Sequence, residues 1–544
     1  MTPSDPLSEL RGAVSAATAA LRDGEALEPS LERPPKPELG DYSSNAAMLL
    51  AAPLGQPPRE VAERLQGELA GRLGESAERI EVAGPGFVNL FLSDRWYRSA
   101  IAGLAAAGET VAVQAATHPQ RVLVEFVSAN PTGPLTAAGG RHAAYGDAVA
   151  RLLEAVGHEV EREYYINDTG GQIERFAVSI AARMTGSELP EDGYEGDYVA
   201  ELGERLGAEH IDPADLDRLA RRGTELMIER VRQTLEAFGV RFESWFSERS
   251  LHESGAIEAA LERLRDAGHT YESEGALWLR TTEFGDDKDR VLLRSGGEPT
   301  YLAADVAYHR NKLERGFERL IDVLGADHHG HVPRLRAALA ALGVDPDAYE
   351  AQIIQLVHIV EAGERTQMSK RRGEFVTLDE LVSDIGVDAA RYFMLQRGHE
   401  TTVDLDLELA RRQSNENPVY YVQYAHARIA SILRKAGKGA ADRALDHDLA
   451  AVAAPLELAE RALVKRLLEL PGEVAEAAAR RTPQRLCAYG TAVAADFHAF
   501  YRDCQVVGAE GEGLEEARLA ICVATQRTIA RTLGLLGISA PERM

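Results

Sequence analysis

A loop rich in glycine, proline and alanine follows an apolar run near residue 121. The run "RVLVEFVSA" has the β-branched and aromatic content of a strand, and "NPTGPLTAAGG" leads from it into the helical stretch "RHAAYGDAVARLLEAVG". Backbone amides in such a loop, with the start of the next helix, can hold an anion such as phosphate. The small side chains from Ala137 to Gly140 let a base or a phosphate approach the backbone. A simple tight turn has the same composition, and the composition of the loop alone favours that interpretation.

A second segment, "GERTQMSKRRGEFVTLDEL", gathers positive charge. Lys370, Arg371 and Arg372 stand in a glycine-flanked loop before a helix that we expect to open at Thr377. Several cations in a loop suit the negative charge that develops on a polyphosphate during attack at its α-phosphorus. A solvated basic turn has the same sequence pattern.

Tyr301 and Asp305 lie four residues apart in "PTYLAADVAYHR". If a helix begins near Tyr301, this spacing puts both side chains on one helical face. A carboxylate there can accept hydrogen bonds from a cationic ligand while the phenol packs beside it. An ordinary amphipathic helix shows the same pattern, so a second feature must point to this face.

Three histidines and an aspartate follow a strand-like run in "GADHHGHV", at Asp327, His328, His329 and His331. Neighbouring residues in a strand-end loop point in alternating directions, so these side chains do not easily converge on one metal ion. We predict hydrogen bonds to a substrate or nucleotide here, and neither zinc nor another metal.

A further candidate site lies in "NENPVYYVQYAHARI". Tyr421, Ala425 and Arg428 are spaced to share a helical face. An aromatic, a small residue and a cation suit a stacked base of single-stranded RNA. An aromatic stripe in a helical core has the same spacing, and both interpretations stay open.

The elements that must position these residues indicate an α/β domain between two other modules. Strand-like runs "RVLVEFVSA", "HEVEREYYI", "RLIDVLGA" and "QIIQLVHIV" alternate with helices, which favours a doubly wound parallel sheet of the Rossmann type. Residues 176 to about 270 are mostly amphipathic helix and are expected as an insertion. Beyond about Thr377 only helices are expected. We predict a multidomain α/β chain with a small α+β N-terminal domain and linker (1–107), the Rossmann domain (108–375), a helical connector (376–414) and an all-α bundle (415–544).

Composition limits the function classes. The 544 residues include 86 acidic and 60 basic side chains, and the net charge of −26 alone suggests no nucleic-acid partner. The cysteines Cys487, Cys504 and Cys522 contain no Cys-x-x-Cys pair, so we expect core residues in a reducing compartment. The N-terminal residues carry acids and no apolar core of signal-peptide length, and no window offers about 18 uninterrupted apolar residues. A cytoplasmic protein without membrane contact is expected.

The glycine-rich loop and "MSK" with its basic tail together resemble the two signature motifs of class I aminoacyl-tRNA synthetases. The residues within and around these motifs resemble those of the arginyl-tRNA synthetases. The phrases that carry this resemblance are "GDYSSNAAMLLA", "VEFVSANPTGPL", "YYINDTGGQIE", "PTYLAADVAYH", "GADHHGHVPRL", "QMSKRRGEFVTLDEL", "GVDAARYFMLQR", "SNENPVYYVQYAHARI" and "SAPERM". It implies an N-terminal domain that contacts the tRNA elbow, a Rossmann catalytic domain and an α-helical anticodon-binding domain. The implied reaction forms arginyl-adenylate from arginine and ATP and then transfers arginine to tRNA(Arg).

The resemblance also implies binding residues. The family's arginine pocket maps onto Glu125, Ser128, Asn130, Tyr301, Asp305 and Asp327. A planar guanidinium needs a carboxylate that accepts a forked pair of hydrogen bonds, which Asp305 can supply. Glu125 and Asn130 would hold the α-amino end.

The nucleotide and tRNA sites are carried over in the same way. ATP as substrate, expected with Mg²⁺, would contact Pro134, Thr136, Ala138, Gly139, Gly140, Met368, Ser369, Lys370 and Arg371. Catalytic roles fall to Lys370, Thr136 and Gly139. The protein is expected to be a monomer. Its contacts with tRNA(Arg) are expected at Phe87, Asn89, Tyr421, Ala425 and Met544.

The chain departs from the family at its first signature. The family usually has His-x-Gly-His after "PTGPL", whereas this chain has Thr136, Ala137, Ala138 and Gly139, and Gln367 stands where a lysine is common. Losing one transition-state donor typically costs about 100- to 1,000-fold in rate. Thr136, Arg141 and His142 are expected as possible substitutes. The alternative function is a catalytically weakened or non-catalytic paralogue that binds tRNA or arginine.

In an acidic protein that binds tRNA, basic side chains must be concentrated on the surface that contacts the RNA phosphates. Candidates in the helical domain are Lys465, Arg466, Arg480, Arg481 and Arg485. The excess of acid is also consistent with a saline cytoplasm.

Overall fold

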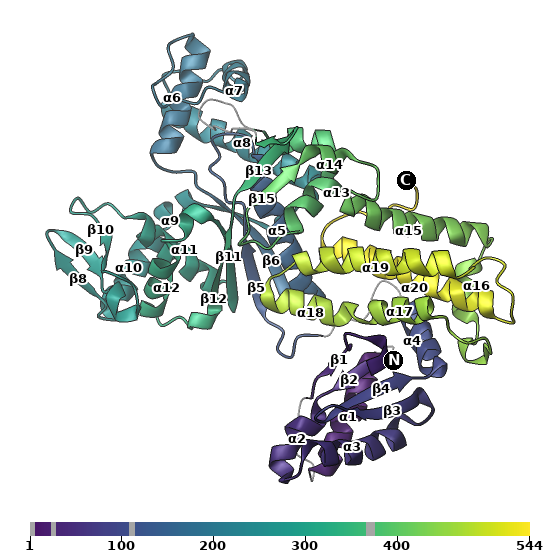
Figure 1. The fold of residues 1–544 in the computed structure, drawn as a ribbon. Helices are drawn as coiled ribbons and strands as arrows, with labels where there is room; N and C mark the ends of the chain where they lie inside the picture. Colours follow the sequence, from purple (N-terminus) through teal and green to yellow (C-terminus); the bar gives the residue numbers. More distant parts are fainter. Residues whose placement is uncertain (1–5, 23–28, 108–114, 366–375) are drawn as a thin grey trace.

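A parallel sheet of five strands forms the centre of the computed structural model, which describes residues 6–22, 29–107, 115–365 and 376–544. The order is β12-β11-β5-β6-β7, and every neighbouring pair is parallel (Figure 1). In that order the strands span Tyr349–Ile354, Arg319–Gly325, Arg121–Glu125, Glu159–Ile166 and Ser244–Ser247. The predicted Rossmann-type sheet is confirmed.

The strand order reverses at β5. β6, the next strand in sequence, lies on one side of β5, and β11 lies on the other. In open parallel sheets, ligands bind beyond the carboxyl ends of the strands at such a reversal. Helix α5 (Ala137–Ala155) follows β5, and α11 (Tyr301–Glu314) and α12 (Val332–Ala341) precede and follow β11. The six residues predicted for the arginine pocket therefore meet at this edge.

Helix α5 packs tightly on the sheet. Its face toward the sheet carries Ala144, Ala148, Leu152 and, at the cap, Val156, and all four residues are buried. Gly146 lies against Phe126, and a Cβ on Gly146 would be 2.2 Å from the Phe126 Cγ. Only glycine permits this approach, so the first turns of α5 have a defined place beside the end of β5.

The predicted insertion contains more than helices. Helices α6 (Gly171–Thr185), α7 (Asp197–Ala208) and α8 (Leu216–Ala237) form a lobe with its own small core. The chain then returns to the sheet as β7 before α9 (Glu248–Glu253) and α10 (Ala256–Asp266). An antiparallel sheet of β8 (Thr270–Ser273), β9 (Ala276–Leu279) and β10 (Arg290–Leu293) follows, at the left of Figure 1. These short strands were not predicted.

The N-terminal module is an antiparallel sheet covered by helices. Its strand order is β1-β2-β4-β3, spanning Leu31–Glu32, Tyr42–Ser44, Phe87–Leu92 and Ala77–Ala83. Its helices are α1 (Pro6–Leu21), α2 (Ala46–Leu54) and α3 (Pro58–Leu73), and α4 (Asp94–Ala106) leads out of the module. Lys465 of the C-terminal helices lies 2.9 Å from Asp41, and Arg461 lies 2.7 Å from Asp94. These pairs join the two ends of the chain.

The expectation of only helices beyond Thr377 is wrong. Strand β15 (Val403–Asp406) pairs in parallel with β13 (Val357–Glu361), which also pairs with β14 (Glu364–Arg365). Consequently "QIIQLVHIV" is divided between two sheets, with its first half in β12. β15 has four residues and alternates buried with exposed side chains, a signal too short to separate from a loop.

Helices make up the rest of the C-terminal half. They are α13 (Leu378–Leu395), α14 (Leu407–Arg411), α15 (Pro418–Lys435), α16 (Ala440–Asp446), α17 (Leu458–Leu468), α18 (Leu470–Arg480), α19 (Gln484–Asp503) and α20 (Leu514–Leu535). All three cysteines are buried and unpaired. Across the described ranges, no helix combines the length and apolarity needed to cross a membrane.

Candidate active site

A cavity of about 790 Å³ opens at the carboxyl edge of β5 and β11. All six residues of the predicted arginine pocket line it. Sequence reasoning did not include several other lining residues, namely Tyr165, Asn167, Glu248, Tyr308, His309, Asp322 and Tyr349. These come from β6, α9, α11, β11 and β12, which only the fold brings together.

Two carboxylates, Asp305 and Glu248, give the cavity its affinity for a cation. Asp305 lies 2.8 Å from Nε2 of His331, and this hydrogen bond raises the pKa of His331. Glu248 is 5% exposed, and among the described residues its Oε2 has no hydrogen-bond partner. Burial raises the pKa of Glu248 to about 7, helped by the charges of Asp305 and Asp168. An acid with a buried, unpaired oxygen beside a second acid is a receptor for a positively charged group.

A buried ion network supports the opposite wall. The Lys312 ammonium is fully buried and lies 2.6 Å from Glu125 Oε2 and 2.9 Å from Asp322 Oδ1. His309 Nε2 lies 2.7 Å from Asp322 Oδ2. Burial raises the pKa of Glu125, whereas the charges of Lys312 and His309 outweigh burial and lower that of Asp322. Lys312 thus holds the Glu125 carboxylate in place at the cavity.

The loop after β5 is strained where it meets the site. Val127 has φ 70° and Ser128 has φ 38°, which are rare for residues other than glycine, above all for a β-branched one. The Ser128 hydroxyl donates to Glu125 Oε1 at 2.8 Å and accepts from the Tyr165 amide at 3.2 Å. Such backbone strain costs about 1–3 kcal/mol per residue. The hydrogen bonds to Ser128 help hold this conformation against β6.

The helix start predicted to bind phosphate is well defined. Thr136 caps α5 by accepting from the Gly139 amide at 3.3 Å. Leu135 and Ala137 are hydrogen-bonded to Leu378 and Val376, which follow the second signature. The structure therefore ties the glycine-rich loop to the segment after "MSK". Met368, Ser369, Lys370, Arg371 and Arg372 themselves lie outside the described residues.

Packing explains one departure from the family pattern. A Cβ on Gly139 would lie 2.6 Å from Leu135 Cδ1, and one on Gly140 would lie 2.7 Å from Leu378 Cδ1. A histidine at position 139 would thus require Leu135 to move. The hydroxyl hydrogen of Thr136 remains available at the helix start, whereas the amides of Gly139 and Gly140 donate to Thr136 Oγ1 and to the Thr136 carbonyl.

Of the two basic residues suggested as substitutes for the missing imidazoles, Arg141 is held by other contacts. Arg141 is 1% exposed and donates to the carbonyls of Gln355 and Gly398 at 2.7 and 2.9 Å. Its predicted role toward phosphate is wrong, because these bonds hold it between β12, β13 and the end of α13. His142 instead lines the cavity.

The five cations proposed to face tRNA do not form a basic patch. Each lies within 4 Å of a carboxylate, which offsets its charge. The pairs are Lys465–Asp41, Arg466–Glu469, Arg480–Glu476, Arg481–Glu350 and Arg485–Glu473. This expectation is corrected, because acidic residues on neighbouring elements cannot be assigned as partners from sequence.

The predicted tRNA contacts differ in exposure. Phe87 and Met544 are 40% and 53% exposed, whereas Asn89 and Ala425 are 3% and 0% exposed. Tyr421 is half-buried against His498. Ala425 therefore faces the helical core, and its proposed contact with RNA remains a prediction.

A face beside Tyr421 offers stacking surfaces. The Arg428 guanidinium lies 5.0 Å from the ring centres of both Tyr424 and Tyr501. Tyr420 stacks on Tyr424 at 6.0 Å. Aromatic rings that are at least partly exposed and lie beside a cation suit the bases of a single strand.

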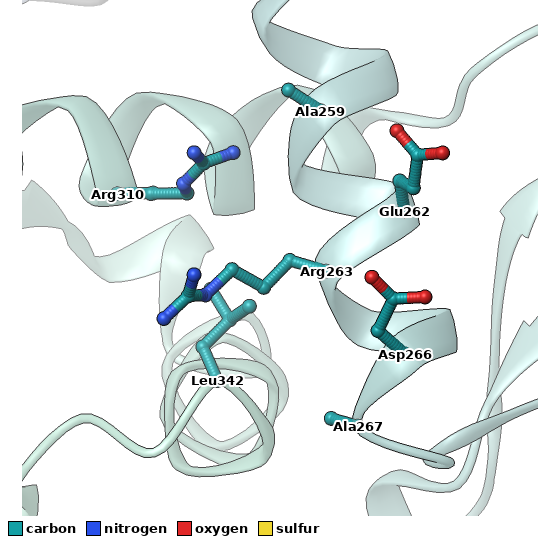
Figure 2. A pocket seen from close by; sticks show the side chains of 7 residues that line it. All are labelled: Ala259, Glu262, Arg263, Asp266, Ala267, Arg310 and Leu342. Carbon is teal, nitrogen blue, oxygen red and sulfur yellow. The ribbon is translucent and has the colours of Figure 1, made fainter.

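A second cavity, of about 510 Å³, lies between α10, α11 and α12 (Figure 2). Its lining consists of Ala259, Glu262, Arg263, Asp266, Ala267, Arg310 and Leu342. Figure 2 shows Arg263 and Arg310 reaching toward its centre, while Glu262 and Asp266 point away from it. Arg310 is paired with Glu314 at 2.8 Å. No residue predicted to bind substrate lies there.

Comparison with known proteins agrees with this geometry. The family model for the class I (R) tRNA synthetase catalytic domain matches residues 103–191 and 212–429. The arginyl-tRNA synthetase N-terminal domain matches 8–92, and the DALR anticodon binding domain matches 422–544. Fold and site together define a class I aminoacyl-tRNA synthetase.

Individual relatives identify the family more closely. Arginine–tRNA ligase of Desulforudis audaxviator is 46% identical over 98% of this chain and 97% of its own length. That of Bacillus subtilis is 44% identical over 94% of both chains. The solved structure of Thermus thermophilus arginyl-tRNA synthetase has a TM-score of 0.77 and 28% identity, and covers 99% of this chain and 100% of that one. The chain belongs to the arginyl-tRNA synthetase family.

Proposed function

We propose that this chain is an arginine–tRNA ligase that activates arginine with ATP and transfers it to tRNA(Arg). The observation that carries the proposal is the acid-lined cavity at the strand reversal, with Asp305 and the unpaired Glu248 oxygen together. A guanidinium presents five N–H donors in a plane and keeps its charge at all physiological pH values. Two carboxylates can accept hydrogen bonds from a guanidinium. An amino acid with a neutral side chain would leave these carboxylates without a cationic partner.

The remaining residues orient the other end of arginine. Glu125, held by Lys312, is the acceptor proposed for the α-ammonium group, and Asn130 and Ser128 lie on the same wall. The arginine carboxylate then faces the start of α5. Tyr301, which is 75% exposed, and Asp327 stand at the margin of the cavity.

Adenylation follows from this orientation. A carboxylate oxygen of arginine attacks the α-phosphorus of ATP, a new oxygen–phosphorus bond forms, and pyrophosphate leaves. The proposed phosphate contacts are the Thr136 hydroxyl and the backbone at Gly139 and Gly140, because a helix start stabilises negative charge. Lys370 is proposed to add positive charge on the leaving side. A terminal ribose hydroxyl of tRNA then attacks the activated carbonyl and releases AMP.

The Mg²⁺ ion would enter the site bound to the phosphates of ATP. Among the described residues, no group of three His, Cys, Asp or Glu side chains could hold a metal ion. Mg²⁺ usually binds through substrate phosphates. We therefore assign Mg²⁺ to the ATP substrate, and propose a cytoplasmic monomer with Phe87, Asn89, Tyr421, Ala425 and Met544 as tRNA contacts.

ATP–pyrophosphate exchange with arginine, in the presence of tRNA(Arg), tests the proposal. Wild-type protein should exchange, and Asp305→Asn should lose at least about 100-fold in kcat/KM for arginine, because the charge partner of the guanidinium is gone. Asp266→Asn, in the second cavity, is the matched control and should retain activity. Absence of exchange in the wild type, with retained tRNA binding, would indicate a non-catalytic paralogue instead.

A further inference from the structure

His142 is a partly exposed residue at the cavity, and one of its ring nitrogens is buried with an unused hydrogen-bonding capacity. It lies on α5, six residues after the cap Thr136, and lines the same cavity as Asp327 and His328. Within the described part of the chain, its buried Nδ1 has no hydrogen-bond partner. A buried polar atom left unpaired costs about 1–3 kcal/mol. A bound ligand that pairs with Nδ1 would recover this energy.

The imidazole is neutral at physiological pH. Burial lowers the pKa of His142 to about 4, and the positive charge of Arg141 acts in the same direction. A hydrogen bond with the Val323 backbone and the charge of Asp327 only partly oppose this shift. A neutral imidazole provides one N–H donor and one acceptor nitrogen, but no positive charge. His142 therefore does not replace a histidine that neutralises a triphosphate.

The charge of the cavity indicates which part of the nucleotide meets His142. Acidic side chains line it at Glu125, Glu248, Asp305, Asp322 and Asp327, so phosphates are repelled from its interior. The helix start that attracts phosphate lies about 9 Å away along the axis of α5, at 1.5 Å per residue. An uncharged group of the substrate that both donates and accepts hydrogen bonds fits His142. The ribose hydroxyls of ATP are such groups.

We propose that His142 binds a ribose hydroxyl of ATP, and so positions the nucleoside instead of the phosphates. This inference rests on the proposed function. His142 thereby acts as a nucleotide-binding residue specific to this chain's form of the glycine-rich loop. The contact discriminates ATP from an analogue that lacks the hydroxyl.

The test compares the binding of ATP, 2′-deoxyATP and 3′-deoxyATP to the full chain by calorimetry. At least one deoxy analogue should bind the wild type about five- to tenfold more weakly than ATP, the effect of one neutral hydrogen bond. His142→Leu should weaken ATP by the same factor without further weakening that analogue. His142→Asn, which keeps a polar atom near the position of Nδ1, should restore most of the preference.

The matched control is His447→Leu. His447 also has a buried ring nitrogen, Nε2, without a partner among the described residues, but it lies in the C-terminal helical region. This variant should keep the wild-type preference for ATP. Unchanged ATP binding in His142→Leu, an equal loss for ATP and both analogues, or a loss confined to arginine overturns the inference. Since Kd is measured without turnover, failed exchange in the wild type refutes the proposed function separately.

Discussion

The pH dependence of arginine binding should follow the ionisation of Glu248. This residue begins α9 directly after β7, and only the pairing of β7 with β6 brings it to the cavity. Burial first, and then the charges of Asp305 and Asp168, raise the pKa of Glu248 to about 7, while hydrogen bonds from Thr169 and Tyr165 oppose the rise. A guanidinium beside Glu248 favours the ionised acid. Arginine binding should therefore lower this pKa and release a proton.

The size of the change in the arginine Kd with pH follows from the pKa of Glu248. With a pKa of about 7 in the free protein, Glu248 is largely ionised at pH 8 and largely protonated at pH 6. Because only the ionised form binds arginine well, Kd should rise about tenfold from pH 8 to pH 6. Glu248→Gln should remove this dependence. It should also weaken binding at pH 8 by about 30-fold or more, since losing one partner of a buried charge pair costs at least ~2 kcal/mol.

Calorimetry at pH 6, 7 and 8, in two buffers with different ionisation enthalpies, measures both Kd and the protons released. His331→Asn is the control, because protonated His331 competes with arginine for Asp305 and its raised pKa acts in the same direction. Most of the loss at pH 6 should persist in His331→Asn and be absent in Glu248→Gln, where only the smaller contribution of His331 remains. A wild-type Kd that does not change with pH, or a Glu248→Gln variant that keeps the full dependence, would refute the reasoning.

Two further substitutions test the supports of the site. Lys312→Met should lower the free energy of unfolding by about 3–5 kcal/mol and raise the KM for arginine, because Glu125 and Asp322 lose their buried cation; a loss below 1 kcal/mol in denaturant titrations would contradict this. Gly146→Ala should cost about 1–3 kcal/mol by overpacking against Phe126. Thermal unfolding should show partial rescue by Phe126→Leu, and an unchanged Tm in Gly146→Ala would contradict the packing argument.

Local patterns were sufficient for the elements at the centre of the site. The run "RLIDVLGA" coincides with β11, and "HVPRLRAALAALG" contains α12. Strand β11 buries four consecutive residues, from Leu320 to Val323, as a central strand of a covered parallel sheet does. The four-residue strand β15 carries too few residues for such a reading, and its pairing partner β13 lies more than 40 residues earlier.

The missed functional residues have no local signal. Glu248 stands in "SERSLHES", where an acid looks like an ordinary exposed residue of a short amphipathic helix. Lys312 likewise looks like a surface cation, yet the fold buries it completely. In both cases the decisive neighbour lies far away in sequence, so burial and charge pairing follow from the arrangement of strands.

The sequence by itself determined the family, the parallel sheet and six residues that line one cavity, because motif residues and hydrophobic period are properties of neighbouring positions in the chain. Tertiary structure alone decided which charges are free and which are paired. It placed Arg141 in internal contacts and paired the five cations of the helical domain with carboxylates. It also left Glu248 Oε2 and His142 Nδ1 at the cavity without a hydrogen-bond partner among the described residues. Electrostatic interactions depend on distance and burial, and both are set by contacts between segments that are distant in the chain.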